Sequence, residues 1–122
     1  MTLPTNFFGS YHIQWNANTD SSNFLSYTSS WSAPVALTTT GGSHSKNANF
    51  VEFKIPFSAI GSPATIKLFV NMLDATGGGT ETTYGMAPAT GFTDGVQSNP
   101  TKYYDCNLLD GNLPTTSCVV TP

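Results

Sequence analysis

The sequence predicts an all-β fold, an antiparallel β-sandwich of the jelly-roll or immunoglobulin-like kind. Short runs alternate between apolar and polar residues, most clearly in "VEFKIPF", residues 51–57. The apolar side chains that share one face of this run are Val51, Phe53, Ile55 and Phe57. No helical periodicity is sustained over ten residues, and Gly- and Pro-rich turns separate the runs. Both features are typical of sandwiches and barrels.

The first half of the chain predicts several short strands. "YHIQWN", residues 11–16, alternates so that Trp15 falls on the inner face and His12 on the solvent face. "NTDSSN" supplies a turn, and strands are expected over residues 24–28 and in the stretch that follows Pro34. "GGSHSKNAN", residues 41–49, has the composition of a loop.

The second half predicts one helical turn and three more strands. "FSAIG" is too short for more than a single turn, and it precedes the alternating run "TIKLFVNML". The inward side chains of that run are expected to be Ile66, Leu68, Val70 and Met72. Residues 74–83 and 83–101 are predicted to be loop and irregular structure. "KYYDCNLL" and "TSCVV" are the last two strands.

The two cysteines, Cys106 and Cys118, predict a disulfide, since an even pair in a secreted chain reads as a bridge. Closing this loop stabilises the fold by roughly 3 kcal/mol through the entropy of the unfolded chain. A two-residue Asp110-Gly111 turn would pair Cys106 with Thr115. Either the turn is wider or the bridge is not a simple cross-strand pair, and we favour the wider loop.

Composition favours one extracellular or cell-surface domain spanning residues 1–122. Only 9% of residues are charged, and neutral polar residues take their place. The net charge is −3 and no arginine is present, which argues against nucleic acid and anionic membranes as partners. No run of about twenty apolar residues predicts insertion in a membrane.

Catalytic chemistry is not predicted. Glycoside hydrolysis needs two carboxylates that face one cleft, and most acids of this chain lie in turn or loop contexts. Glu52 is expected to face outward beside Lys54, and His44 is expected in a loop with no acid nearby in sequence. No Gly-x-Ser-x-Gly motif occurs. We therefore expect the protein not to be an enzyme.

Two kinds of ligand site are considered. Aromatic rings can stack on the faces of sugars, and four side chains are candidates for such a site: Tyr27, Trp31, Tyr84 and Tyr103. Calcium is a less specific alternative, because it takes several oxygen ligands from loops. Its candidate ligands border the irregular stretch 74–99: Asp74, Glu81 and Asp94. No other cofactor is expected.

Several motifs occur in a characteristic order over residues 50–109: "VEFKIPFSAIG", "PATIKLFVNML", a Gly-rich gap, "TYGMAP", "GFTDG" and "TKYYDCNL". In this order they resemble the second half of the CBM9-like and DOMON-like β-sandwiches of bacterial extracellular proteins. The resemblance implies an accessory, non-catalytic module, since relatives are associated with carbohydrate binding, with haem or sugar binding, or with no known ligand. The chain is shorter than such domains usually are, as though N-terminal strands were missing, and it lacks a pair of Trp on one strand face.

The sequence therefore predicts a non-catalytic extracellular binding module, with a polysaccharide or glycan as the first ligand class. The alternative is a structural subunit of a pilus, filament, adhesin or surface layer, completed by a strand from a partner chain or a second copy. A binding module should be a stable monomer, whereas an assembly subunit should oligomerise or need a partner segment.

Overall fold

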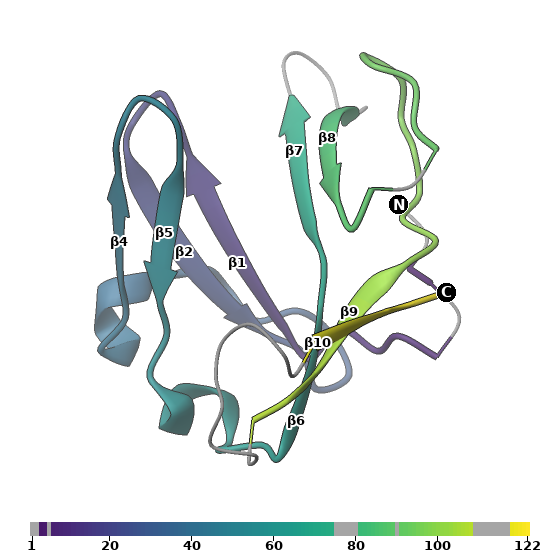
Figure 1. Cartoon of the computed structure of the whole chain (residues 1–122). Coiled ribbons are helices and arrows are strands. Elements are labelled where there is room, and N and C mark those ends of the chain that lie inside the picture. The colour runs from purple at the N-terminus through teal and green to yellow at the C-terminus, as the bar shows by residue number, and fades with distance from the viewer. Residues whose placement is uncertain (1–2, 5, 75–80, 90, 109–117) are drawn as a thin grey trace. The chain divides into compact units, whose positions relative to one another are not determined.

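The computed structural model describes residues 3–4, 6–74, 81–89, 91–108 and 118–122, and over these residues it contains strands and 3₁₀ turns but no α-helix (Figure 1). Every strand pairing is antiparallel. The predicted all-β, antiparallel class is therefore confirmed, and its sheets are of the kind that build β-sandwiches. None of the described residues forms a helix that could cross a lipid bilayer.

The chain divides into two compact units, residues 9–63 and residues 1–8 with 64–122. We call them the 9–63 unit and the C-terminal unit and describe each by itself. The prediction that residues 1–122 fold as a single domain stays a prediction.

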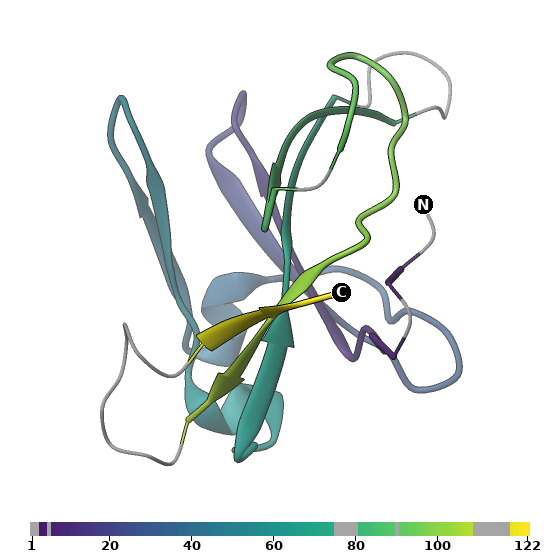
Figure 2. The ribbon, with the colours of Figure 1, turned by 45° about the vertical axis from the view of Figure 1, so that its right-hand side comes forward.

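The 9–63 unit contains two sheets and two 3₁₀ turns (Figure 2). A three-stranded sheet has the order β1-β2-β3, and β4 and β5 form a separate hairpin. The elements of the unit are β1 (Tyr11–Asn16), β2 (Ser21–Ser26), β3 (Val35–Ala36), η1 (Leu37–Thr40), β4 (Ser43–Lys46), β5 (Val51–Lys54) and η2 (Phe57–Ile60).

The turn between β1 and β2 is built by amide side chains. The Asn16 side-chain oxygen accepts hydrogen bonds from the backbone N–H groups of Asn18 and Thr19, at 2.9 and 3.2 Å. Asp20 closes the turn with φ of 50°, a left-handed conformation that Asp and Asn tolerate better than most residues. β2 begins at Ser21, earlier than its turn-like sequence predicts, because Ser21 and Ser22 pair with the end of β1.

Leu37 is the centre of the buried core in this unit, with 0% of its surface exposed. The predicted strand after Pro34 is only two residues long, and the chain then turns into η1. Hydroxyl groups favour this turn, since Thr39 donates to the Ala36 carbonyl and Thr40 to the Leu37 carbonyl, both at 2.7 Å. Gly41 ends η1 in the left-handed conformation, with φ of 79°.

The prediction of a loop over residues 41–49 is wrong, because β4 lies within it. Its sequence, Ser-His-Ser-Lys, has no apolar alternation, since β4 belongs to a two-stranded sheet and is mostly exposed. Its partner is the alternating run at β5, with His44 opposite Phe53. On β5 the expected pattern holds for Val51 and Phe53, which are half-buried. Phe57 is exposed and begins η2, the single turn that "FSAIG" predicts.

The C-terminal unit has a three-stranded sheet of order β10-β9-β6 and a hairpin of β7 and β8. Its strands are β6 (Thr65–Leu68), β7 (Val70–Asp74), β8 (Thr82–Ala87), β9 (Tyr103–Asn107) and β10 (Cys118–Thr121). The prediction that residues 83–101 are irregular is wrong over β8, which is a strand. Its pairing with β7, rather than its own pattern, makes this stretch a strand.

The run "TIKLFVNML" is two strands and not one. Ile66 and Leu68 are half-buried as predicted, but Val70 and Met72 on β7 are exposed. The alternation changes face at Phe69, which lies between the two strands and packs its ring on Phe7, with centroids 5.1 Å apart. β6 then pairs with β9 and β7 with β8, so one run serves two sheets.

The predicted disulfide joins Cys106 on β9 to Cys118 on β10. The two cysteines lie directly opposite each other in the ladder, the register that the wider loop requires. The Asp110-Gly111 stretch lies outside the described residues.

Candidate functional site

Three rings form an aromatic cluster at one end of the β1–β2 hairpin: His12, Tyr27 and Trp31. The centroids of Tyr27 and Trp31 are 5.3 Å apart with the ring planes at 63°. The His12 ring lies 5.8 Å from Trp31 at 62°. Tyr27 is 45% exposed and Trp31 is 44% exposed, so more than half of each is packed while a large aromatic surface still meets solvent. We call these three residues the aromatic cluster.

Backbone hydrogen bonds hold the aromatic cluster in place. Tyr27 and Trp31 form a bridge that continues from β2, and the Ser32 N–H donates to the Ser26 carbonyl at 2.8 Å. The Ser32 hydroxyl in turn accepts from the Ser26 N–H at 3.1 Å. The Tyr27 N–H donates to the Ser10 carbonyl at 2.9 Å, which ties the turn to the start of β1. A ring site on such a turn is largely fixed before a ligand arrives, which lowers the entropy cost of binding.

The other two predicted aromatic candidates belong to the C-terminal unit. Tyr84 on β8 is exposed. Tyr103 is 3% exposed, because its ring packs against Phe7 and the Lys67 ammonium lies 5.0 Å from its centroid. Tyr103 is therefore a core residue with no surface for a ligand, which corrects its prediction as a binding residue. The Phe7 ring comes from the start of the chain, so the segment around Tyr103 does not by itself indicate this burial.

The three acids predicted to bind calcium do not come together. Over the described residues, which include all three, no group of three or more His, Cys, Asp or Glu side chains could hold a metal ion. Asp74 ends β7, and Glu81 and Asp94 lie on either side of β8.

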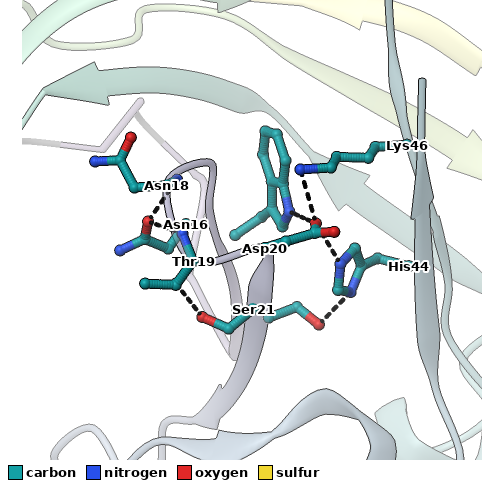
Figure 3. A network of polar contacts seen from close by, with 9 residues as sticks. Asn16, Asn18, Thr19, Asp20, Ser21, His44 and Lys46 are labelled. Carbon is teal, nitrogen blue, oxygen red and sulfur yellow. Dashed lines mark hydrogen bonds and ion pairs between the residues drawn. The ribbon is translucent and has the colours of Figure 1, made fainter. Parts of the chain in front are cut away.

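A cluster of polar side chains, separate from the aromatic cluster, connects the two sheets of the 9–63 unit (Figure 3). One oxygen of Asp20 accepts from the Trp15 indole N–H at 3.1 Å and lies 3.0 Å from His44 Nε2. The Lys46 ammonium is 3.4 Å from the same oxygen and 5.6 Å from the centre of the Trp15 ring. The other His44 nitrogen, Nδ1, is 2.8 Å from the Ser22 hydroxyl. These contacts place His44 beside an acid that lies far from it in sequence.

The electrostatics of this cluster are dominated by the Asp20 carboxylate. The hydrogen bond from Trp15, followed by those from His44 and Lys46, lowers the pKa of Asp20 below its ordinary value of 3.8. The carboxylate is therefore ionised at neutral pH. Trp15 is half-buried, in partial agreement with its predicted core position, and its N–H finds a side-chain partner.

Hydrogen bonds that run from a serine to a histidine to an acid also occur in the catalytic triads of acyl-transfer enzymes. A nucleophilic hydroxyl must be open to a substrate carbonyl. Ser22 is 8% exposed and lies within β2, whereas the acid, Asp20, is the exposed member of the three. This distribution favours a structural role for the contacts between Ser22, His44 and Asp20.

Sequence reasoning misses His44 and Asp20 because they lie 24 residues apart and meet only through folding. The one sequence signal is that Asp20 lies in a polar turn after an alternating strand, and this position does not indicate which residue Asp20 contacts. The proximity of Tyr27 and Trp31 could be predicted from the sequence, because four residues separate them within one turn.

In comparisons with known proteins, no family model, no curated protein and no solved structure matches this chain.

Proposed function

We propose that the protein is a non-catalytic extracellular binding module that takes carbohydrate at the aromatic cluster. The observation that carries the proposal is the pair Tyr27 and Trp31, two contacting rings that keep nearly half of their surface in solvent. Exposed rings of this kind offer apolar faces to the C–H groups of a sugar. Burial of such a ring face is a large part of the binding free energy that a small site can supply.

Polar groups around the aromatic cluster suit the hydroxyl groups of a sugar. The exposed side chains of Thr28 and Ser30 lie on the same turn as the two rings. His12 and Gln14 project from the same face of β1, since they are two residues apart on one strand. The side chains of Thr28, Ser30 and Gln14 carry no charge, which favours a neutral sugar over a phosphate or a nucleic acid.

The extracellular location rests on the disulfide and on composition. A disulfide persists in oxidising compartments and is rare in the cytosol. The low charge and the high content of Ser, Thr and Asn agree with this assignment.

A glycan array tests the proposal, with the oxidised protein, Trp31→Ala and Tyr27→Ala compared side by side. Truncating a central aromatic contact should weaken binding at least roughly tenfold. Phe50→Ala is the matched control, because Phe50 is an exposed aromatic residue of the same unit outside the aromatic cluster. An array with no signal from the folded wild-type protein contradicts the proposal, as does equal loss of binding in the Phe50 variant.

A second function, a subunit of a surface assembly, is favoured by one observation. Among the described residues β10 is the outermost strand of its sheet, it carries no charged residue, and Val119 and Val120 are both exposed. Uncharged edge strands readily accept a strand from another chain. Sedimentation over a concentration series distinguishes the two functions. A growing oligomer that Val119→Lys abolishes supports assembly, and a monomer at every concentration supports the binding module.

A further inference from the structure

The two sheets of the 9–63 unit share no ladder of backbone hydrogen bonds among the described residues. Side chains join them instead, near the turn of the β1–β2 hairpin. Asp20 from the turn between β1 and β2 and Ser22 from β2 contact His44 and Lys46 of β4 (Figure 3). We call these four residues the clasp: Asp20, Ser22, His44 and Lys46.

The hydrogen-bond directions in the clasp follow from the charge of Asp20. An ionised carboxylate only accepts, so His44 Nε2 must carry the proton that it donates to Asp20. In the neutral ring Nδ1 is then an acceptor, and the Ser22 hydroxyl donates to it. Every polar atom of the His44 ring has a partner in this state.

The same geometry satisfies the charged ring. When Nδ1 takes up a proton it becomes a donor, and the Ser22 hydroxyl can rotate to accept from it because a hydroxyl serves in both roles. The added charge attracts Asp20, whose side-chain oxygen lies 3.0 Å from His44 Nε2. It repels Lys46, whose ammonium lies 3.4 Å from the same oxygen. These two effects oppose each other.

Other groups near His44 do not add a charge on its side of the hairpin. Phe53 lies opposite His44, with ring centroids 6.4 Å apart. Glu52 and Lys54 lie opposite Ser45 and Ser43, so they project from the other face of the hairpin. The charges that decide whether the clasp stays closed are therefore those of Asp20, His44 and Lys46.

We propose that the clasp is an acid-released device: it holds the β4–β5 hairpin on the β1–β2 hairpin while Asp20 is ionised, and opens when Asp20 becomes protonated. Both protonation states of the His44 ring keep a partner at each nitrogen, so the loss of the Asp20 charge is what weakens the clasp. Once Asp20 is neutral, its oxygen no longer offers a negative charge to Lys46 or to the His44 ring. Opening also frees the Trp15 indole N–H and uncovers its ring.

NMR of the full oxidised chain tests the proposal through contacts between protons of the two sheets. The contacts to follow are His44 ring to Ser22 and Trp15 ring to Lys46, from about pH 8 to about pH 2. Both should persist while the Asp20 carboxylate is ionised, and both should fall severalfold as Asp20 protonates, which its lowered pKa places below the ordinary value of 3.8. The Trp31–Tyr27 contact should be unchanged throughout.

The variant Asp20→Asn removes the charge and keeps a residue that tolerates the left-handed backbone at this position. It should show the weakened contacts already at pH 7, whereas Asp94→Asn, at an exposed carboxylate of the other unit, should behave as the wild type. Loss of the contacts between about pH 8 and pH 5, where Asp20 stays ionised, would overturn the proposal. So would undiminished contacts in Asp20→Asn. The wild-type titration decides the matter even if that variant does not fold.

Discussion

Gly42→Ala should destabilise the 9–63 unit, although it adds only one methyl group. A Cβ atom at residue 42 would lie 2.9 Å from both Cγ and Cδ1 of Leu37 and 3.0 Å from the backbone oxygen of Lys54. Leu37 is fully buried, so it cannot move aside without opening the core, and the Lys54 oxygen belongs to the backbone of β5. Overpacking of this kind costs about 1 to 3 kcal/mol.

The cost can be read as a shift in melting temperature. With an unfolding entropy of about 2.1 cal/mol/K per residue, 1 kcal/mol corresponds to about 4 °C for a chain of 122 residues. Gly42→Ala should therefore lower Tm by about 4 to 12 °C in calorimetry or circular dichroism. Urea unfolding should show a lower midpoint with an unchanged slope.

The matched control is Gly91→Ala, because a Cβ there would meet nothing within 4 Å. An open Gly→Ala change usually stabilises a protein by about 0.4 to 1 kcal/mol, since the unfolded chain loses freedom. Gly91→Ala should leave Tm unchanged or raise it slightly. If Gly42→Ala behaves in the same way, the close packing of Gly42 under Leu37 is refuted.

Two further predictions concern the disulfide and acid stability. Replacing Cys106 and Cys118 together by Ser should lower the free energy of unfolding by roughly 3 kcal/mol, measured by urea titration, and an unchanged midpoint would contradict the role of the bridge. The pKa of Asp20 is lower in the folded than in the unfolded protein, through its bonds from Trp15, His44 and Lys46. Its contribution to stability is therefore present above the unfolded value and is lost as the pH falls below about 4. Asp20→Asn should flatten the decrease of Tm in that range, and a parallel decrease in wild type and variant would show that Asp20 is not responsible.

Those parts of the fold that depend on local pattern could be predicted from the sequence. β1 follows the alternation of residues 11–16, and "FSAIG" forms the expected single turn. The cysteine pair and its wider loop follow from composition and register. In these cases the physical cause, a side-chain period or a cross-link, is contained within the segment itself.

The missed elements depend on partners that are distant in the chain. β4 carries only polar side chains and becomes a strand because β5 pairs with it. The run over β6 and β7 changes face at Phe69 because Phe7, from the start of the chain, packs on its ring. A period calculated within the run continues through Phe69, so it assigns Val70 and Met72 to the wrong face.

The residues of the candidate site show the same difference between contacts within one segment and contacts between distant segments. Tyr27 and Trp31 lie within one turn, so their proximity could be expected, whereas Tyr103 is buried by packing that its own segment does not encode. Asp20, Ser22 and His44 meet across two sheets, and no spacing in the sequence indicates it.

Carbohydrate binding at the aromatic cluster is tested most directly by the indole N–H signals of the two tryptophans. The protein contains only Trp15 and Trp31, and the Trp15 N–H is bonded to Asp20, so Trp15 is an internal reference. Titration with a soluble oligosaccharide chosen from the array should shift the Trp31 signal to saturation and leave the Trp15 signal in place. A saturable shift of Trp15 alone, or no shift of either signal, would contradict the account.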